Sequence, residues 1–316
     1  MNAKYKYWLD CAGWLIMAAA MIFLVFMGWQ YRVWFSAWRP HGSVVGIMLF
    51  GMMICAGALS LLALAWFKLV QYWVPTASFK DVFRLYARTQ IAKYIPGNVF
   101  HLAGRWVGGY RIGLSHQANM GATIYEIAGM LVVAVFISAY GFLSPSFHKG
   151  VFQILLGIGL FLGMAAFPFL AVKITAWIVP LCCMANWPLQ TRLVFRCGVI
   201  PAYFVYIFVF LVLGLLFTGW TWVLSGVGRC ASSFYIISVF TTAWLIGFIT
   251  PGSSGGLGVR EAVLVSLMSN NVGVPESMII AVGFRFITIG GDVLLFVCSF
   301  FRPDCSNMSV LPNSHA

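Results

Sequence analysis

Two stretches of the chain combine proline, glycine and arginine in a way that could hold an anion. The first is KYIPGNVFHLAGR, residues 93–105, and the second is TPGSSGGLGVRE, residues 250–261. In both, an arginine lies nine positions after the proline, at Arg105 and at Arg260. Proline and repeated glycines interrupt a helix, and the helix that restarts points free N–H groups and a positive dipole end at the gap. Since arginine adds planar, bidentate recognition of phosphate or carboxylate, these residues predict an anion-accepting pocket.

Three further ionisable residues, Glu126, Arg285 and Asp292, lie inside otherwise apolar stretches. An unpaired charge there costs roughly 3 to 10 kcal/mol or more, so each must pair or face water. Structural pairing alone would explain them, and that interpretation stays open beside a binding role. Glu261 follows Arg260 directly and points to another side of a helix, so we expect it to pair elsewhere. The candidate binding residues are Lys93, Pro96, Gly97, Asn98, Arg105, Glu126, Pro251, Gly252, Gly255, Gly256, Gly258, Arg260, Glu261, Arg285 and Asp292.

The elements that would position these residues are predicted to be membrane helices. Apolar residues make up 62% of the 316 and charged residues 8%, against roughly 45–50% and about 25% in soluble domains. A helix needs ~20 apolar residues to cross a hydrocarbon core of ~30 Å. The stretches that meet this requirement are 9–29, 44–67, 118–142, 151–171, 198–223, 232–250 and 278–300. We therefore predict an all-α, polytopic transmembrane helix bundle with about seven to eight spans.

The two broken segments are predicted to be re-entrant, at about 91–112 and 250–270, and to form an internal repeat. Broken helices in corresponding halves are typical of transporters built from repeats. The alternative is two cytoplasmic loops with ordinary turn chemistry, although their flanking residues stay apolar. Four predicted spans separate the segments, which puts both on the same face, whereas an inverted repeat needs an odd number; residues 172–184 are a weak candidate for another crossing. One membrane domain is expected over 1–303, with a polar tail over 304–316.

The charge distribution predicts an orientation in the membrane. Nineteen Lys and Arg against seven Asp and Glu give a formal charge of +12. The basic residues concentrate in 68–112 and 172–197, whereas 143–150 and 224–231 carry one each. The positive-inside rule then places the N-terminus and the basic loops in the cytoplasm, in a multi-pass protein of the cytoplasmic (inner) membrane. Segment 76–90 is amphipathic and predicts an interfacial helix, although simple positive-inside anchoring accounts for its charge equally well.

Several classes of site are missing from the sequence. The eight cysteines form no CxxC pair and the five histidines form no HExxH helix, so we expect no metal site. No GxxxxGK[ST] loop is present, so ATP is not expected to drive the protein directly. We expect no cofactor and no nucleic-acid partner.

The two broken segments also carry a family resemblance. PGSSGGLGVREAVLV, followed by GVPESMIIAVGFRFI, resembles the motif of the flippase-like membrane domain of lysyl-phosphatidylglycerol synthases, which also occurs as a stand-alone membrane protein. In KYIPGNVFHLAGR, the residues that match the family's first motif are Lys93, Tyr94, Pro96, Gly97 and Arg105. The resemblance covers roughly residues 5–300. The serine pair at 253–254 departs from the shorter glycine turn of the family.

The resemblance implies movement of a phospholipid or lipid-linked anionic compound between leaflets, with Arg105, Glu126, Arg260, Glu261 and Arg285 as its residues. The aminoacyl-transferring domain of the fused enzymes is absent, so no lysyl-lipid synthesis is expected. Two alternatives stay open. One is an enzyme or membrane subunit of glycolipid or cell-envelope polymer synthesis that acts on a polyprenyl-phosphate carrier, with Glu261 as its catalytic carboxylate. The other is a non-transporting scaffold for a partner synthase or a second copy of the chain, packed through the small-residue patterns Gly104–Gly108, Gly109–Gly113 and Gly159–Gly163.

Overall fold

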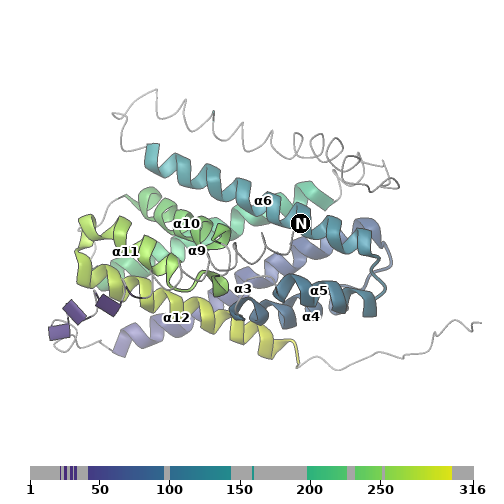
Figure 1. The fold of residues 1–316 in the computed structure, drawn as a ribbon, viewed down its shortest axis with the longest axis horizontal. Coiled ribbons are helices and arrows are strands. Elements are labelled where there is room, and N and C mark those ends of the chain that lie inside the picture. The colour runs from purple at the N-terminus through teal and green to yellow at the C-terminus, as the bar shows by residue number, and fades with distance from the viewer. Residues whose placement is uncertain are drawn as a thin grey trace, which may run out of the picture.

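The computed structural model describes residues 42–95, 100–143, 198–225, 232–250 and 253–300, together with residue 159 and a few positions between 22 and 33. Within these ranges every regular element is a helix (Figure 1). The elements are α3 (Gly42–Trp73), α4 (Phe79–Gln90), η1 (Ile91–Tyr94), α5 (Phe100–Arg111), α6 (His116–Leu143), α9 (Ile200–Ser225), α10 (Ser233–Ile249), η4 (Ser254–Gly256), α11 (Val259–Val272) and α12 (Val274–Cys298).

Four helices, α3, α6, α9 and α12, are long and apolar enough to cross a membrane. They confirm helices at four of the predicted spans, 44–67, 118–142, 198–223 and 278–300. The predicted span at 151–171, and all but a few positions of the one at 9–29, lie outside the described residues. The structure therefore carries the helices of a membrane protein, and these four lie side by side along its long axis (Figure 1).

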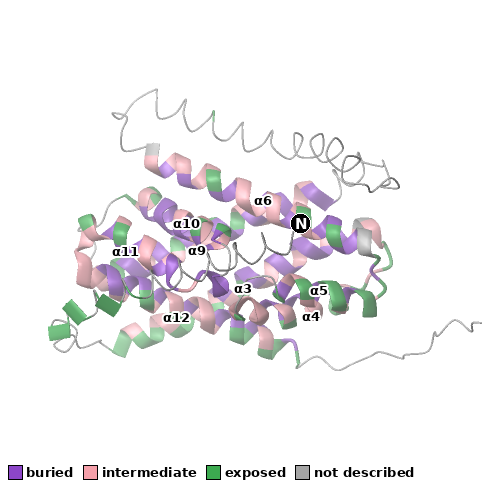
Figure 2. Ribbon diagram, in the orientation of Figure 1, coloured by how far each residue is buried: buried purple, intermediate pink, exposed green. Residues whose placement is uncertain are grey.

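The outer faces of these helices are apolar as well. On α3, Val45, Leu49 and Met53 are more than half exposed at a spacing of about one turn, and Phe204 and Phe208 repeat the pattern on α9. Exposed positions run along the outer sides of the bundle in Figure 2. Large exposed apolar patches are rare on soluble monomers, whereas a lipid tail is as apolar as leucine. The interior between the helices is filled by buried side chains such as Trp66, Phe217 and Ile287.

The two broken segments each form a helical hairpin. Hairpin 1 consists of α4, η1 and α5: Thr89 lies against Gly104, and Leu85 lies against Gly108. The two helices are antiparallel, because the later residue of α4, Thr89, lies against the earlier residue of α5, Gly104. The glycines let α5 approach closely, since a Cβ at Gly108 would collide with Leu85. This small-residue pattern therefore packs the protein's own helix α4. The amphipathic segment 76–90 forms α4, which buries Val82, Tyr86, Ala87 and Gln90 in the bundle as one arm of this hairpin.

Hairpin 2 consists of α10, η4 and α11. Tyr235 Oη, near the start of α10, donates to the carbonyl of Leu267, near the end of α11, at 3.2 Å. Gly247, near the end of α10, lies against Arg260 at the start of α11. With 17 residues, α10 is about 25 Å long, which is shorter than the ~30 Å hydrocarbon core. The predicted span at 232–250 is therefore a helix, but its position makes it a hairpin arm.

The two hairpins approach α12 from opposite ends. At the far end of α12, the Arg88 guanidinium of hairpin 1 lies 4.7 Å from the ring centre of Phe300, and the tip of hairpin 1 reaches back to Asp292 through Lys93. Hairpin 2 is joined to the start of α12 by Gly273 alone, and its tip reaches forward to Arg285. The count of four spans that puts both segments on the same face includes α10, which at 17 residues is shorter than the four long helices.

Candidate functional site

The candidate site lies where the tips of the two hairpins meet. The 3₁₀ turns η1 and η4 are in contact, and Gly255 packs against Tyr94 and the carbonyl of Lys93. Gly255 and Gly256 have φ of 57° and 75°, a left-handed conformation that favours glycine. Arg285 Nη2 of α12 donates to the carbonyl of Gly255 at 2.9 Å. Tyr94 of hairpin 1 and Arg285 of α12 thus hold the turn of hairpin 2 in place.

A buried ion pair joins hairpin 1 to the next long helix. Arg105 Nη1 of α5 lies 2.5 Å from Glu126 Oε2 of α6, and both side chains are at most 3% exposed. Tyr86 Oη donates to the other carboxylate oxygen, Glu126 Oε1, at 2.9 Å. Asn119 Nδ2 donates to the backbone carbonyls of Arg105 and Trp106 at 3.2 Å each, which ties α5 to α6. The pairing predicted for Glu126 is therefore present, and each of its two carboxylate oxygens has a partner, Arg105 or Tyr86.

A second ion pair links hairpin 1 to α12. Lys93 Nζ lies 2.7 Å from Asp292 Oδ2, and Tyr94 Oη donates to the same oxygen at 2.5 Å. Asp292 is 1% exposed, whereas 23% of the Lys93 side chain is exposed. The two partners are 199 positions apart in sequence. Asp292, which lies in the predicted span 278–300, thus accepts its cation from the first broken segment.

Glu261 has two partners in hairpin 2 and α12. Its Oε2 accepts from the backbone N–H of Gly258 at 2.7 Å, which caps the start of α11. Its Oε1 lies 3.4 Å from Arg285 Nε. The expectation that Glu261 pairs away from Arg260 agrees with this geometry. The cap also changes one expectation, because the N–H of Gly258 at the head of α11 binds Glu261 and is not free for an anion.

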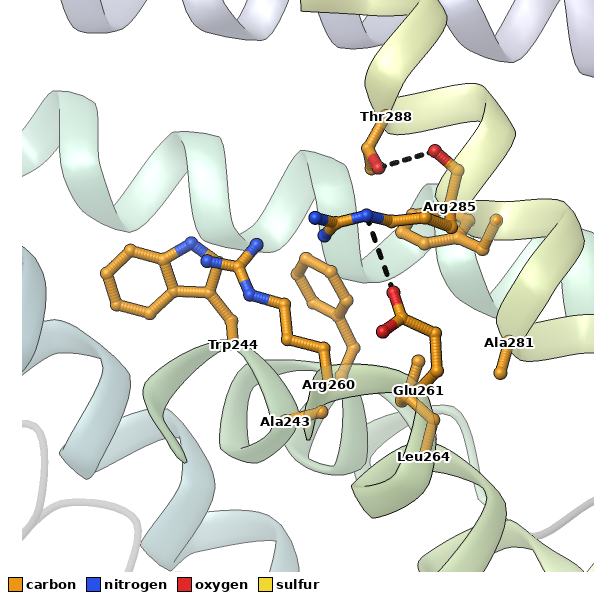
Figure 3. A pocket seen from close by; sticks show the side chains of 10 residues that line it. Ala243, Trp244, Arg260, Glu261, Leu264, Ala281, Arg285 and Thr288 are labelled. Atoms are coloured by element: carbon orange, nitrogen blue, oxygen red, sulfur yellow. Dashed lines mark hydrogen bonds and ion pairs between the residues drawn. The ribbon is translucent and has the colours of Figure 1, made fainter. Parts of the chain in front are cut away.

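Arg260 differs from the other cations of the site. No carboxylate of the described residues lies within salt-bridge distance of it, and its Nε is buried without a hydrogen-bond partner. Its side chain fills a slot between two glycines: a Cβ at Gly247 would collide with Arg260 Cγ, and one at Gly256 would lie 2.6 Å from Nε. The guanidinium carbon lies 5.7 Å from the ring centre of Trp244, beside which it is drawn in Figure 3. The pKa of Arg260, which lies outside the four long helices, is lowered to about 10 by burial and then by Arg285, so it stays cationic at neutral pH.

Two cavities share Arg260 as a wall. The larger, of about 90 Å³, lies between the hairpins. Its polar lining consists of Tyr86, Gln90, Lys93, His101, Arg105, Glu126 and Arg260. The smaller, of about 30 Å³, lies between hairpin 2 and α12 and is drawn in Figure 3 with Glu261, Arg285 and Thr288 in its wall. A cavity of this kind needs about 10–15 Å³ to hold a water, so both are large enough to do so.

Three residues that line the larger cavity have a buried nitrogen without a hydrogen-bond partner. Arg105 Nε, Arg260 Nε and His101 Nδ1 are buried without hydrogen-bond partners. His101 lies on α5, outside the four long helices; burial, followed by Arg105 and Lys93, lowers its pKa to about 3, so it is neutral at physiological pH. Around the cavities, four cations (Lys93, Arg105, Arg260 and Arg285) accompany three carboxylates (Glu126, Glu261 and Asp292). Among the described residues, the cluster therefore has an excess of one positive charge.

The structure brings most of the predicted site residues together. Lys93, Arg105, Glu126, Gly255, Gly256, Gly258, Arg260, Glu261, Arg285 and Asp292 all lie at or next to the two cavities. Pro96, Gly97, Asn98, Pro251 and Gly252 lie outside the described residues. Several lining residues were missed from the sequence, among them Tyr86, His101 and Trp244. Tyr86 sits on the apolar face of 76–90, where its hydroxyl gave no separate signal. No group of three metal-ligating side chains occurs in the described part of the chain.

No family model, no curated protein and no solved structure matches the chain.

Proposed function

We propose that the protein is a lipid flippase or lipid transporter, which moves a phospholipid or lipid-linked anionic compound between the leaflets of the cytoplasmic membrane. The observation that carries this proposal is the positively charged cavity between two hairpin tips that approach from opposite ends of α12. The resemblance of both broken segments to the flippase-like domain of lysyl-phosphatidylglycerol synthases supports the same function.

In this proposal the hairpins are re-entrant segments of an inverted repeat. Each unit has the same order of parts: a helix, a 3₁₀ turn, a short helix, a glycine with positive φ (Gly113 or Gly273) and a long helix. Each short helix is also ion-paired to the long helix that follows it, through Arg105–Glu126 in one unit and Glu261–Arg285 in the other. Broken helices that meet near the membrane centre are typical of substrate sites in transporters.

The cavity would lower the main barrier to flipping, which is the desolvation of a charged headgroup in hydrocarbon. A headgroup bound beside Arg260 would exchange water for charge-assisted hydrogen bonds, while the acyl chains stay in lipid. Without an ATP-binding loop in the sequence, movement would be downhill or coupled to an ion.

The geometry weighs against a catalytic Glu261 and against a scaffold packed through Gly104 and Gly108. A catalytic Glu261 would need a free carboxylate, but both of its oxygens are engaged, by Gly258 N–H and by Arg285. A scaffold that uses Gly104 and Gly108 would need these residues on an outer surface, but they lie against Thr89 and Leu85 of the same chain.

The test is a flipping assay in vesicles. The purified chain is reconstituted into phosphatidylcholine vesicles with fluorescent phosphatidylglycerol, and a membrane-impermeant quencher reports the lipid left in the outer leaflet. With the wild type, we expect most of the labelled lipid to reach the outer leaflet and be quenched. Arg260→Gln should lower the rate of flipping about tenfold or more, which is the effect of one charge-assisted hydrogen bond. Gly219→Ala is the matched control, because a Cβ at Gly219 meets nothing within 4 Å. Protein-free rates for the wild type would refute the proposal.

A further inference from the structure

Arg260 lines both cavities and is the cation that the cluster leaves without a carboxylate among the described residues. We infer that the larger cavity binds one singly charged phosphodiester group, with Arg260 as its counter-ion. This inference rests on the proposed function and deepens it, because it names the chemical class of the headgroup.

The charge of the cluster decides how much negative charge the site can take. Glu126, Glu261 and Asp292 each neutralise one cation, which leaves a single positive charge at Arg260. A phosphodiester carries one negative charge and balances it. A phosphomonoester carries about two negative charges at neutral pH, and a diphosphate carries more, so either would leave uncompensated charge in a site of low dielectric. The site therefore favours a phospholipid over a polyprenyl phosphate or diphosphate.

The size and the donors of the cavity fit a phosphate group. A volume of about 90 Å³ leaves room for a phosphate group. The unpartnered nitrogens of Arg105, Arg260 and His101 come from two helices, α5 and α11. Donors from separate elements suit a tetrahedral oxyanion, whose oxygens point in several directions, better than a planar carboxylate.

The glycine slot allows a test that keeps the charge of Arg260. In Gly247→Ala the new methyl group would displace the Arg260 side chain without removing its guanidinium, whereas Arg260→Gln removes the cation. Gly219→Ala makes the same substitution in helix α9, where a Cβ meets open space. A loss of binding shared by the first two variants and absent from the third would depend on the position of Arg260 and not on a general effect of glycine replacement.

The experiment measures binding of small anions to the full-length protein in a mild non-ionic detergent at pH 8, from the rise in its unfolding temperature with ligand concentration. The probes are dimethyl phosphate (one negative charge), methyl phosphate and inorganic phosphate (mostly two), and acetate (one). We expect dimethyl phosphate to bind most tightly. Arg260→Gln and Gly247→Ala should each weaken this binding about tenfold or more, as expected for one charge-assisted hydrogen bond, and Gly219→Ala should bind like the wild type. Elution of each variant as the same folded species controls for misfolding.

Three results would overturn the inference. Equal binding of dimethyl phosphate by the wild type and both variants at the slot would remove Arg260 from the site. Tighter binding of methyl phosphate would contradict the charge balance, and tighter binding of inorganic phosphate would make free phosphate, not a lipid, the ligand. Acetate binding as tightly as dimethyl phosphate would reduce the site to one for any monoanion.

The vesicle assay separates this inference from the proposed function. If dimethyl phosphate does not bind but the wild type still flips phosphatidylglycerol, the phosphodiester site is wrong and the flippase proposal stands. If it binds through Arg260 but no lipid moves, the site stands and the flippase proposal falls.

Discussion

Within the charge cluster, the ion pairs differ in how much water they can reach, and this difference sets the cost of breaking each one. Arg105 and Glu126 are both nearly inaccessible, whereas the Lys93 side chain that pairs with Asp292 is 23% exposed. A buried charge that loses its partner is uncompensated, while a partly exposed one can turn to water.

We therefore expect Glu126→Gln to destabilise the protein by about 3–5 kcal/mol, because it leaves the Arg105 guanidinium buried without a counter-charge. Asp292→Asn should cost less. Unfolding of both variants in the same detergent, followed by circular dichroism, measures the two costs. Equal losses would mean that exposure of Lys93 does not relieve its charge.

His101 predicts how stability responds to acid. Its pKa is lowered from 6.5 to about 3 in the folded protein, so between these values the unfolded chain binds the extra proton. Its contribution is fully present above pH 6.5 and is lost as the pH falls toward 3. Between pH 7 and pH 5.5 the loss should be roughly 1 kcal/mol. Thermal unfolding at both pH values should show a smaller loss for His101→Gln than for the wild type; an identical loss would exclude His101 as its source.

At this scale the sequence predicted which residues carry charge into the bundle but not every partner. Glu126, Asp292 and Arg285 stand out because ionisable residues are costly in apolar stretches. Their partners depend on tertiary contact: Lys93 and Asp292 are 199 positions apart. Arg105 and Arg260 occupy corresponding positions after their prolines. Only the structure shows that Arg105 pairs with Glu126, whereas Arg260 has no carboxylate partner among the described residues.

At the scale of the elements, the hairpins depend on glycines at their contact faces. Gly108 lies against Leu85 across hairpin 1, whereas Gly57 on α3 has open space where a Cβ would be. Gly108→Ala should lower stability by about 1–3 kcal/mol through overpacking. Gly57→Ala should be neutral or stabilising by up to about 1 kcal/mol, since alanine favours a helix more than glycine does. Parallel unfolding curves for the two variants measure the difference, and a loss in both would point to a general effect of the methyl group.

Composition identified the helices well and their roles less well. The apolar stretches at 118–142 and 198–223 correspond to α6 and α9 within a few residues, because length and hydropathy suffice for a long span. The stretch at 232–250 is equally apolar, yet it forms the hairpin arm α10. Its role follows from its contacts with α11 and from the break at its end, and hydropathy contains neither. The same limit applies to α4, whose amphipathic face buries in the bundle.

At the scale of the whole molecule, the basic residues predict which side each hairpin faces. Lys68, Lys80 and Arg111 lie at the open end of hairpin 1, where Gly198 at the start of α9 also packs against Lys68. The junction between hairpin 2 and α12, residues 270–276, has Glu276 and no Lys or Arg. The positive-inside rule therefore predicts that the open end of hairpin 1 faces the cytoplasm and that of hairpin 2 the opposite side.

Cysteine labelling tests this topology. In a background whose native cysteines are replaced, Thr76→Cys marks the open end of hairpin 1 and Asn270→Cys that of hairpin 2; both positions are exposed. A membrane-impermeant maleimide added to intact cells should label residue 270 and spare residue 76, and disrupted cells should label both. Labelling of both or neither in intact cells would put the two ends on one side.

The single-residue joint at Gly273 has a mechanical consequence. Because one glycine connects α11 to α12, there is no slack between them. If hairpin 2 withdraws from the centre, it pulls on the helix that carries Asp292, the anchor for the tip of hairpin 1. We expect the two tips to be coupled, so that withdrawal of hairpin 2 also disturbs the Lys93–Asp292 contact that holds the tip of hairpin 1.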